Sequence, residues 1–238
     1  MEAFERNARQ RDLVPQESLN NTSVIVIGVG AIGRQVATLL ACMGAQRITI
    51  VDPDIVGTEN LAVQGYMPAD VGKLKVNVMK GVLEAYNPGN IHVQALNEKY
   101  KKYCDPLRQE GDQLAVFCCV DSIADRKFIW RALANGPFTR DFDLLVDGRM
   151  AAEVLKVLTW KKGTSTKGYE ISLHDPSESY QAPCTGRTTL YTSYTIAGMM
   201  VGEFAKWLRN QILTTEQMYN MLSSDFTVVE PEVACDLI

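Results

Sequence analysis

The sequence predicts a doubly wound α/β fold, in which a mostly parallel sheet is extended by antiparallel strands. The first observation is that apolar, β-branched runs alternate with runs of helical periodicity between residues 21 and 150. The second is that residues 24–27 are apolar on both faces, as in a strand buried within a parallel sheet. The third is that residues 151–169 alternate apolar and polar side chains, which favours added antiparallel strands.

The elements follow from these patterns in chain order. Strands are predicted at residues 24–27, 48–51, 91–96, 114–120 and 144–147, and a further one from Asp225. Helices are predicted after Gly33, between Gly72 and Tyr86, and at residues 122–135 and 190–213, with a last short helix from Thr214. Residues 1–20 form a polar arm with too little apolar content to fold back on its own core.

Composition excludes several classes of protein. The 238 residues, 46% of them apolar and 22% charged, suit one soluble globular domain. The net charge of −4 provides no basic field for nucleic acid or for an anionic membrane. The N-terminus is charged from residue 2, unlike a signal peptide, and no apolar run approaches the roughly 18 residues of a membrane span. A cytoplasmic location is expected.

The six cysteines follow no C-x-x-C spacing, so no structural zinc is expected. Cys118 and Cys119 fall within an apolar run, which predicts buried thiols of a core strand.

A glycine motif after the first predicted strand indicates a nucleotide site. Gly28, Gly30 and Gly33 form G-x-G-x-x-G between a strand and a helix, and the next strand ends at Asp52. The first glycine permits a tight turn, the second allows backbone N–H groups to approach a phosphate, and the third lets helix pack on strand. Asp52 is placed to accept a ribose hydroxyl. The alternative is a glycine-rich turn without a ligand.

The residues after Asp52 narrow the class of nucleotide enzyme. The chain continues as D-P-D-x-V-x-x-x-N-L to Asn60 and Leu61, then Q-G-Y from Gln64, then D-V-G-K-L-K to Lys75. This string resembles the activating-enzyme family that includes ThiF, MoeB, HesA and the adenylation domains of ubiquitin-activating enzymes, over residues 6 to about 208. One position departs from the family pattern, because Val63 stands where an arginine is usual.

The resemblance implies a Rossmann-like fold, ATP and Mg²⁺, and it assigns roles to residues. Asn60 and Lys75, with Lys73 as the fallback, would contact the phosphates, and Asp121 would bind magnesium. A structural alternative for Asp121 is that it only caps the following helix. Arg9 matches the second arginine of R-x-x-R-Q, which in the family reaches the ATP site of the neighbouring subunit. A homodimer is therefore implied.

Two further residues have more than one possible role. Cys184 lies in P-C-T-G-R, which resembles the segment that carries the thioester cysteine of ubiquitin-activating enzymes; the alternative is an incidental loop thiol. Arg149 could approach a phosphate or could pin a loop. Either Arg149 or Arg187 could replace the cation missing at Val63.

The predicted reaction is attack of a carboxylate on the α-phosphate of ATP, which needs no general base because the carboxylate is already ionised. The resemblance implies that the carboxylate is the C-terminal glycine of a small ubiquitin-like or sulfur-carrier protein. A thioester on Cys184 could follow, and then a downstream conjugating or sulfur-transfer protein. The alternatives are a non-catalytic scaffold subunit of this fold and an NAD-dependent oxidoreductase.

The whole chain, residues 1–238, is expected to form one adenylation domain. Its expected parts are the arm (1–20), the ATP-binding half (21–150) and the extension with the Cys184 loop, last long helix and tail (151–238).

Overall fold

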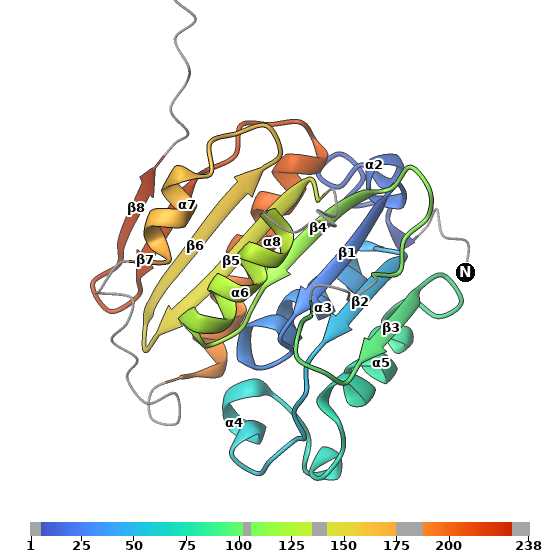
Figure 1. Ribbon diagram of the computed structural model, residues 1–238. Coiled ribbons are helices and arrows are strands. Elements are labelled where there is room, and N and C mark those ends of the chain that lie inside the picture. The colour runs from blue at the N-terminus through green and yellow to red at the C-terminus, as the bar shows by residue number, and fades with distance from the viewer. Residues whose placement is uncertain (1–5, 102–105, 135–141, 175–187, 230–238) are drawn as a thin grey trace, which may run out of the picture.

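The computed structural model describes residues 6–101, 106–134, 142–174 and 188–229. Within these ranges, eight strands form one sheet in the order β3-β2-β1-β4-β5-β6-β7-β8 (Figure 1). β1 to β5 are parallel, whereas β6, β7 and β8 each run antiparallel to their neighbours. The strands are β1 (Thr22–Ile27), β2 (Arg47–Val51), β3 (His92–Leu96), β4 (Gln113–Cys118), β5 (Leu144–Ala151), β6 (Val154–Lys161), β7 (Glu216–Asn220) and β8 (Asp225–Val229). The predicted class of fold is confirmed.

Helices cover both faces of the sheet. α3, α5 and α8 pack on one face, and α6 and α7 on the other (Figure 1). The helices are α2 (Gln16–Asn20), α3 (Ala31–Met43), α4 (Asn60–Gln64), the 3₁₀ turn η1 (Pro68–Asp70), α5 (Lys75–Tyr86), α6 (Ile123–Ala134), α7 (Lys167–Ser172) and α8 (Leu190–Leu208). None of the helices in the described ranges has the length and apolar character needed to cross a membrane.

The first strand and helix follow directly from their sequence. β1 is buried along its whole length because it lies between β2 and β4, which explains why its residues are apolar on both faces. α3 ends where Gly44 adopts a left-handed φ of 104°. The Gly44 N–H then donates to Ala41 O (3.2 Å) and the Ala45 N–H to Leu40 O (3.1 Å), which satisfies carbonyls at the end of the helix.

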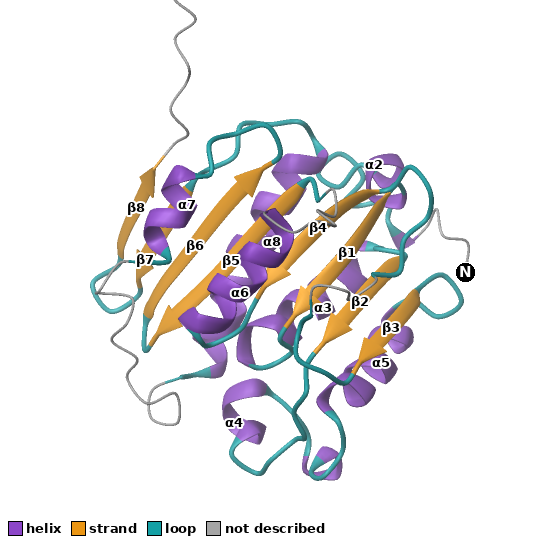
Figure 2. Ribbon diagram, in the orientation of Figure 1, coloured by secondary structure: helices purple, strands orange, loops and turns teal. Residues whose placement is uncertain are grey.

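The strand order creates a switch point between β1 and β4. The chain runs from β1 outward through β2 to β3, and then crosses back to place β4 on the other side of β1. The loops that follow β1 and β4 therefore leave in opposite directions at the carboxyl edge, where open α/β sheets bind ligands. Figure 2 shows α4 beyond the carboxyl ends of β1 and β2, at this edge.

Two local predictions were wrong. The residues after Thr214 were expected to form a short helix, but they form β7, which pairs with β6 and β8. Gln217 points from β7 into the core and donates to Glu203 of α8, a distant contact that outweighs the local helix-start signal. The alternating run of residues 151–169 was expected to form antiparallel strands; it does so as β6, but it then turns at Gly163 (φ 88°) and continues as α7.

The N-terminal arm packs on its own chain, contrary to the sequence-based expectation. The Arg6 guanidinium donates to Ala41 O (3.0 Å) and Tyr86 O (2.9 Å), and the Gln10 amide donates to Met43 O (3.0 Å). These carbonyls belong to the last turns of α3 and α5, where the regular hydrogen bonds of the helix run out and carbonyl oxygens can accept from other parts of the chain. Polar capping and the burial of Val14 and Leu19 in the core together hold the arm in place.

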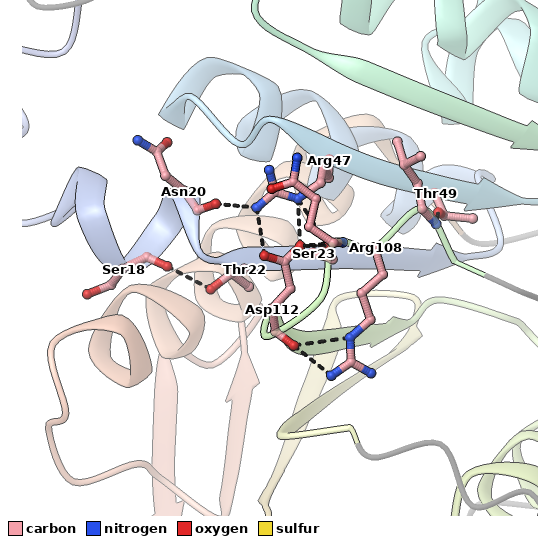
Figure 3. A network of polar contacts seen from close by, with 10 residues as sticks. Ser18, Asn20, Thr22, Ser23, Arg47, Thr49, Arg108 and Asp112 are labelled. Atoms are coloured by element: carbon pink, nitrogen blue, oxygen red, sulfur yellow. Dashed lines mark hydrogen bonds and ion pairs between the residues drawn. The ribbon is translucent and has the colours of Figure 1, made fainter.

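A buried polar network joins the strands at the opposite, amino edge of the sheet. Arg47 binds Asp112 through two nitrogens, with Nε 2.6 Å from Oδ2 and a terminal nitrogen 3.0 Å from Oδ1 (Figure 3). The Ser23 hydroxyl donates to the same carboxylate at 2.6 Å. Both charged side chains are only 6% exposed. The network therefore ties the starts of β1, β2 and β4 together.

Candidate nucleotide site

The three glycines of the loop after β1 differ in what a side chain at each position would contact. Gly28 has φ 87°, and a Cβ there would lie 2.9 Å from the carbonyl oxygen of Cys119. A Cβ on Gly33 would lie 1.8 Å from Gly28 O, so only glycine fits where α3 meets the loop. A Cβ on Gly30 would meet only the Gln64 amide, at 3.8 Å or more. Two glycines thus shape the loop, while Gly30 leaves its backbone open to a ligand.

Asp52 holds the glycine loop in addition to facing the edge where a ribose would bind. Its Oδ2 accepts the Val29 N–H at 2.8 Å, and its Oδ1 accepts the Asp54 N–H at 2.9 Å. Burial raises the pKa of Asp52, and these two hydrogen bonds offset part of that rise. Each oxygen retains a second lone pair, so a ribose hydroxyl can still donate to the carboxylate.

The segment after Asp54 closes over the loop as α4. The Asn60 side chain is buried, and its Oδ1 accepts the Gly57 N–H at 2.8 Å, which fixes the turn into α4. At the other end of α4, the buried Tyr66 hydroxyl donates to Val29 O at 2.7 Å. Val29 is thereby held from both sides, by Asp52 and by Tyr66. This role of Tyr66 was missed, although the Q-G-Y string was its sequence signal.

The two candidate lysines lie in different surroundings. Lys75 is the first residue of α5, its side chain is 6% exposed, and its Nζ lies 2.9 Å from Asp54 Oδ2. Lys73 is 59% exposed and lies 3.8 Å from Asp70. Only Lys75 therefore contacts the D-P-D loop that contains Asp52. A buried ammonium at a helix N-terminus is unfavourable unless an anion is near, and here Asp54 is that anion. Because Lys75 adjoins the loop of Asp52 and Lys73 does not, Lys75 is the better placed of the two candidates.

Asp121 lies just beyond β4, on the other side of the switch point, and is exposed. The cap of α6 is Ser122, whose hydroxyl accepts the Asp125 N–H at 3.3 Å. The alternative role of Asp121 as the helix cap is therefore taken by its neighbour. Magnesium in nucleotide sites is held by one or two carboxylates together with phosphates, so one exposed aspartate fits that donor set. The described ranges contain no group of three or more His, Cys, Asp or Glu that could form a protein-only metal site.

Arg149 pins a helix. Its Nε lies 2.9 Å from Asp147 Oδ2, and its terminal nitrogens donate to Ser172 O (3.2 Å) and Ser172 Oγ (3.0 Å). Asp147 also binds Arg126 at 2.9 Å, so it joins β5 to α6 and α7. Although burial by itself would raise it, the two guanidinium groups lower the pKa of Asp147. Arg149 is committed to this buried cluster and does not replace the cation missing at Val63.

The structure places the remaining predicted residues in three different situations. Arg9 is exposed on the arm, near the C-terminal end of α3, whereas the glycine loop adjoins the N-terminal end of this 13-residue helix. The two ends are about 20 Å apart at 1.5 Å per residue, so Arg9 lies far from its own glycine loop. Cys184 and Arg187 lie outside the described residues. Cys118 and Cys119 are buried as predicted, and burial raises the pKa of both thiols.

Comparisons with known proteins identify the family of this chain. The ThiF family profile matches residues 4–234. Over 150 residues the chain is 29% identical to adenylyltransferase and sulfurtransferase MOCS3 of Caenorhabditis briggsae, covering 57% of this chain and 34% of that protein. Over 116 residues it is 30% identical to the molybdopterin-synthase adenylyltransferase of Salmonella typhimurium, covering 48% of this chain and 46% of that protein. The chain thus spans between a third and a half of the length of these relatives.

Among solved structures, E. coli MccB bound to MccA superposes with a TM-score of 0.70 at 19% identity, covering 95% of this chain and 71% of MccB. At that identity the likeness shows the fold, and MccB has also been solved with ATP. The glycine loop, the D-P-D segment and the family match over nearly the whole chain lead to one conclusion: this chain is a member of the ThiF family.

Proposed function

We propose that the protein uses Mg²⁺ and ATP to adenylate a carboxylate, which gives an acyl-adenylate and pyrophosphate. The observation that carries this proposal is the position of Lys75. Its buried ammonium contacts the D-P-D loop through Asp54, and the first aspartate of that loop holds Val29 of the glycine loop. The loop proposed to bind phosphate, the acid proposed to bind ribose and a cation thus belong to one connected structure at the carboxyl edge.

The chemistry requires positioning and charge neutralisation. An ionised carboxylate attacks the α-phosphorus, the bond to the bridging oxygen breaks, and pyrophosphate leaves with that electron pair. Lys75 and the backbone N–H groups at Gly30 would stabilise the phosphates, and Asn60 would hydrogen-bond to a phosphate oxygen. Asp121 would hold Mg²⁺, which neutralises charge on the leaving pyrophosphate. Asp52 would hold the ribose, so that the α-phosphate stays in register with the carboxylate.

The proposed substrate is the C-terminal carboxylate of a small ubiquitin-like or sulfur-carrier protein. Support comes from the names of the two relatives, an adenylyltransferase and sulfurtransferase and a molybdopterin-synthase adenylyltransferase. We further propose a homodimer in which Arg9 enters the partner's site, since it lies far from its own. Acyl transfer to Cys184 as a thioester would follow, with release of AMP. A cytoplasmic location accords with this chemistry.

The test is ATP–pyrophosphate exchange with a panel of small ubiquitin-like and sulfur-carrier proteins that end in Gly-Gly. Each panel protein is compared with its own variant that lacks the last two residues. Exchange that requires the intact C-terminus and Mg²⁺ is the expected result. Asp121→Ala should abolish exchange while the circular dichroism spectrum and melting temperature stay unchanged.

Three outcomes would contradict the proposal or a part of it. If Asp121→Ala exchanges at the wild-type rate, the magnesium assignment is wrong. If no panel protein supports exchange although the chain binds Mg·ATP, the proposed substrate class is wrong and the non-catalytic scaffold gains support. Fluorescence of NADH that changes on binding, together with no affinity for ATP, would instead indicate the oxidoreductase alternative.

A further inference from the structure

The contact between α3 and α4 holds an unusual concentration of buried polar atoms without hydrogen-bond partners. Five such side-chain atoms occur in the described residues, and three of them lie here: Arg34 Nε, Gln35 Oε1 and Gln64 Oε1. Each such atom costs about 1–3 kcal/mol if nothing binds it. Because α3 begins at the glycine loop, this cost is concentrated beside the place where a phosphate would bind.

Arg34 lies one turn from the loop and is connected to it. The backbone N–H of Arg34 donates to Gly30 O at 3.1 Å, so Arg34 lies in the first turn of α3. The centre of its guanidinium lies 5.1 Å from the centroid of the Tyr66 ring, and the Tyr66 hydroxyl reaches Val29 O. The aromatic face orients the planar guanidinium without neutralising its charge.

The end of α4 leaves space for this side chain. One terminal nitrogen of Arg34 lies 3.2 Å from the position that a Cβ on Gly65 would take. Gly65 also has φ 77°, a conformation that favours glycine. Across the same contact, the Gln64 amide faces Gly30 of the loop. Arg34 and Gln64 therefore flank the start of α3.

Arg34 differs from the buried arginines in how its positive charge is balanced. Arg47 is paired with Asp112, and both Arg126 and Arg149 with Asp147. For Arg34, the described part of the chain provides no carboxylate within ion-pair distance, only the ring of Tyr66. A partly buried guanidinium that lacks an acid is suited to an anionic ligand, which it can bind through two nitrogens.

The same contact is where the family cation is missing. Val63 lies on α4, directly before Gln64, and is half-buried. We propose that Arg34 contacts the β- or γ-phosphate of ATP and replaces, from α3, the arginine that Val63 lacks on α4. This inference rests on the proposed function, because it assigns a further substrate contact in the same site. Arg34 would therefore recognise the triphosphate tail of ATP and the pyrophosphate that leaves.

The experiment compares two nucleotides that differ only in the tail, AMP and the non-cleavable analogue α,β-methylene ATP, by calorimetry with Mg²⁺. Neither measurement needs an acyl partner. Arg34→Met should weaken the analogue about ten- to a hundredfold, the range expected for charge-assisted hydrogen bonds, and change AMP affinity less than about twofold. Arg34→Lys, which keeps a cation, should lie between. Adding Val63→Arg to Arg34→Met should restore most of the lost affinity.

Lys80→Met is the matched control, since it removes an exposed cation from α5 and should change neither affinity. Equal weakening of AMP and the analogue by Arg34→Met would show a packing role and overturn the inference, as would failure of Val63→Arg to restore affinity. If Arg34→Met does not fold, the Arg34→Lys and Val63→Arg variants still decide. Binding of neither nucleotide by the wild-type chain would overturn the proposed function as well.

Discussion

The ammonium group of Lys75 lies 2.9 Å from the carboxylate of Asp54, although the lysine is 6% exposed and the aspartate 60% exposed. The cation is thus held by an acid that water already solvates. An arriving phosphate can compete for Lys75, because Asp54 loses little when it turns back to solvent. Under the proposed function, this pair would hold the ammonium beside the D-P-D loop before nucleotide binds.

Lys75→Met should therefore weaken Mg·ATP binding about ten- to a hundredfold, since a charge-assisted contact to phosphate is lost. Lys73→Met, at the exposed position, should change the affinity less than about twofold. Calorimetry on both variants checks this. A larger effect from Lys73 than from Lys75 would reverse the assignment of the two lysines.

Substitutions of the loop glycines should separate effects on stability from effects on nucleotide binding. Gly33→Ala places a Cβ 1.8 Å from Gly28 O and should lower the free energy of unfolding by about 3 kcal/mol or more. Gly30→Ala has room to fold and should keep the melting temperature, but its methyl group occupies the approach of a phosphate and should abolish ATP binding. Gly81→Ala, on α5 with no atom within 4 Å, should stabilise slightly and is the control. Urea titration and calorimetry distinguish the three.

Asp112 predicts an acid-dependent loss of stability. Burial by itself would raise the pKa of Asp112, but hydrogen bonds from Ser23, the Gln109 N–H and Arg47, with the charge of Arg47, leave it below its ordinary value. A lowered folded-state pKa contributes stability above the unfolded-state pKa of about 3.9, and the contribution is lost as pH falls through the folded-state value. The wild-type chain should thus lose stability below about pH 4.

Asp112→Asn leaves Arg47 buried without its acid and should cost about 3–5 kcal/mol at neutral pH. Its stability should also depend less on pH in the acid range. Adding Arg47→Met should recover part of the loss, because no unpaired charge remains. Chemical denaturation of the single and double variants measures the coupling; an additive result would show that the pair does not act as a unit.

Arg9 predicts complementation between subunits. Arg9→Ala and Asp121→Ala homodimers should each be inactive, while mixing them creates dimers with one intact site and one doubly altered site. With random exchange, half the dimers are mixed and half their sites work, giving about a quarter of wild-type exchange activity. No recovery, with subunit exchange confirmed by native mass spectrometry, would exclude a shared site.

Cys184 predicts a step separate from adenylation. Cys184→Ala should keep pyrophosphate exchange and lose any adduct with the partner protein that a thiol reductant releases. Cys235→Ala is the control and should keep both. A reductant-sensitive adduct that survives in Cys184→Ala would assign the thioester to another cysteine.

The sequence alone determined the family, the sheet with its nucleotide loop, and the likeness of residues 52–75 to an ATP site. These signals are local, because glycine conformation, strand burial and a fixed spacing of polar residues are each decided within a short stretch. The sequence also placed Lys75 ahead of Lys73, and the structure adds that Lys75 is buried beside Asp54 whereas Lys73 is exposed.

Only the tertiary structure decided the rest. The commitment of Arg149 to Asp147 and Ser172, the formation of β7 in place of a helix, and the capping of α3 and α5 by Arg6 depend on contacts between residues far apart in the chain. The stacking of Arg34 on Tyr66 likewise joins two residues that are too far apart in the chain for a local sequence pattern to reveal the contact. Such contacts outweigh local preference because the burial and pairing of a charged or polar group involve several kcal/mol, whereas a propensity involves about one.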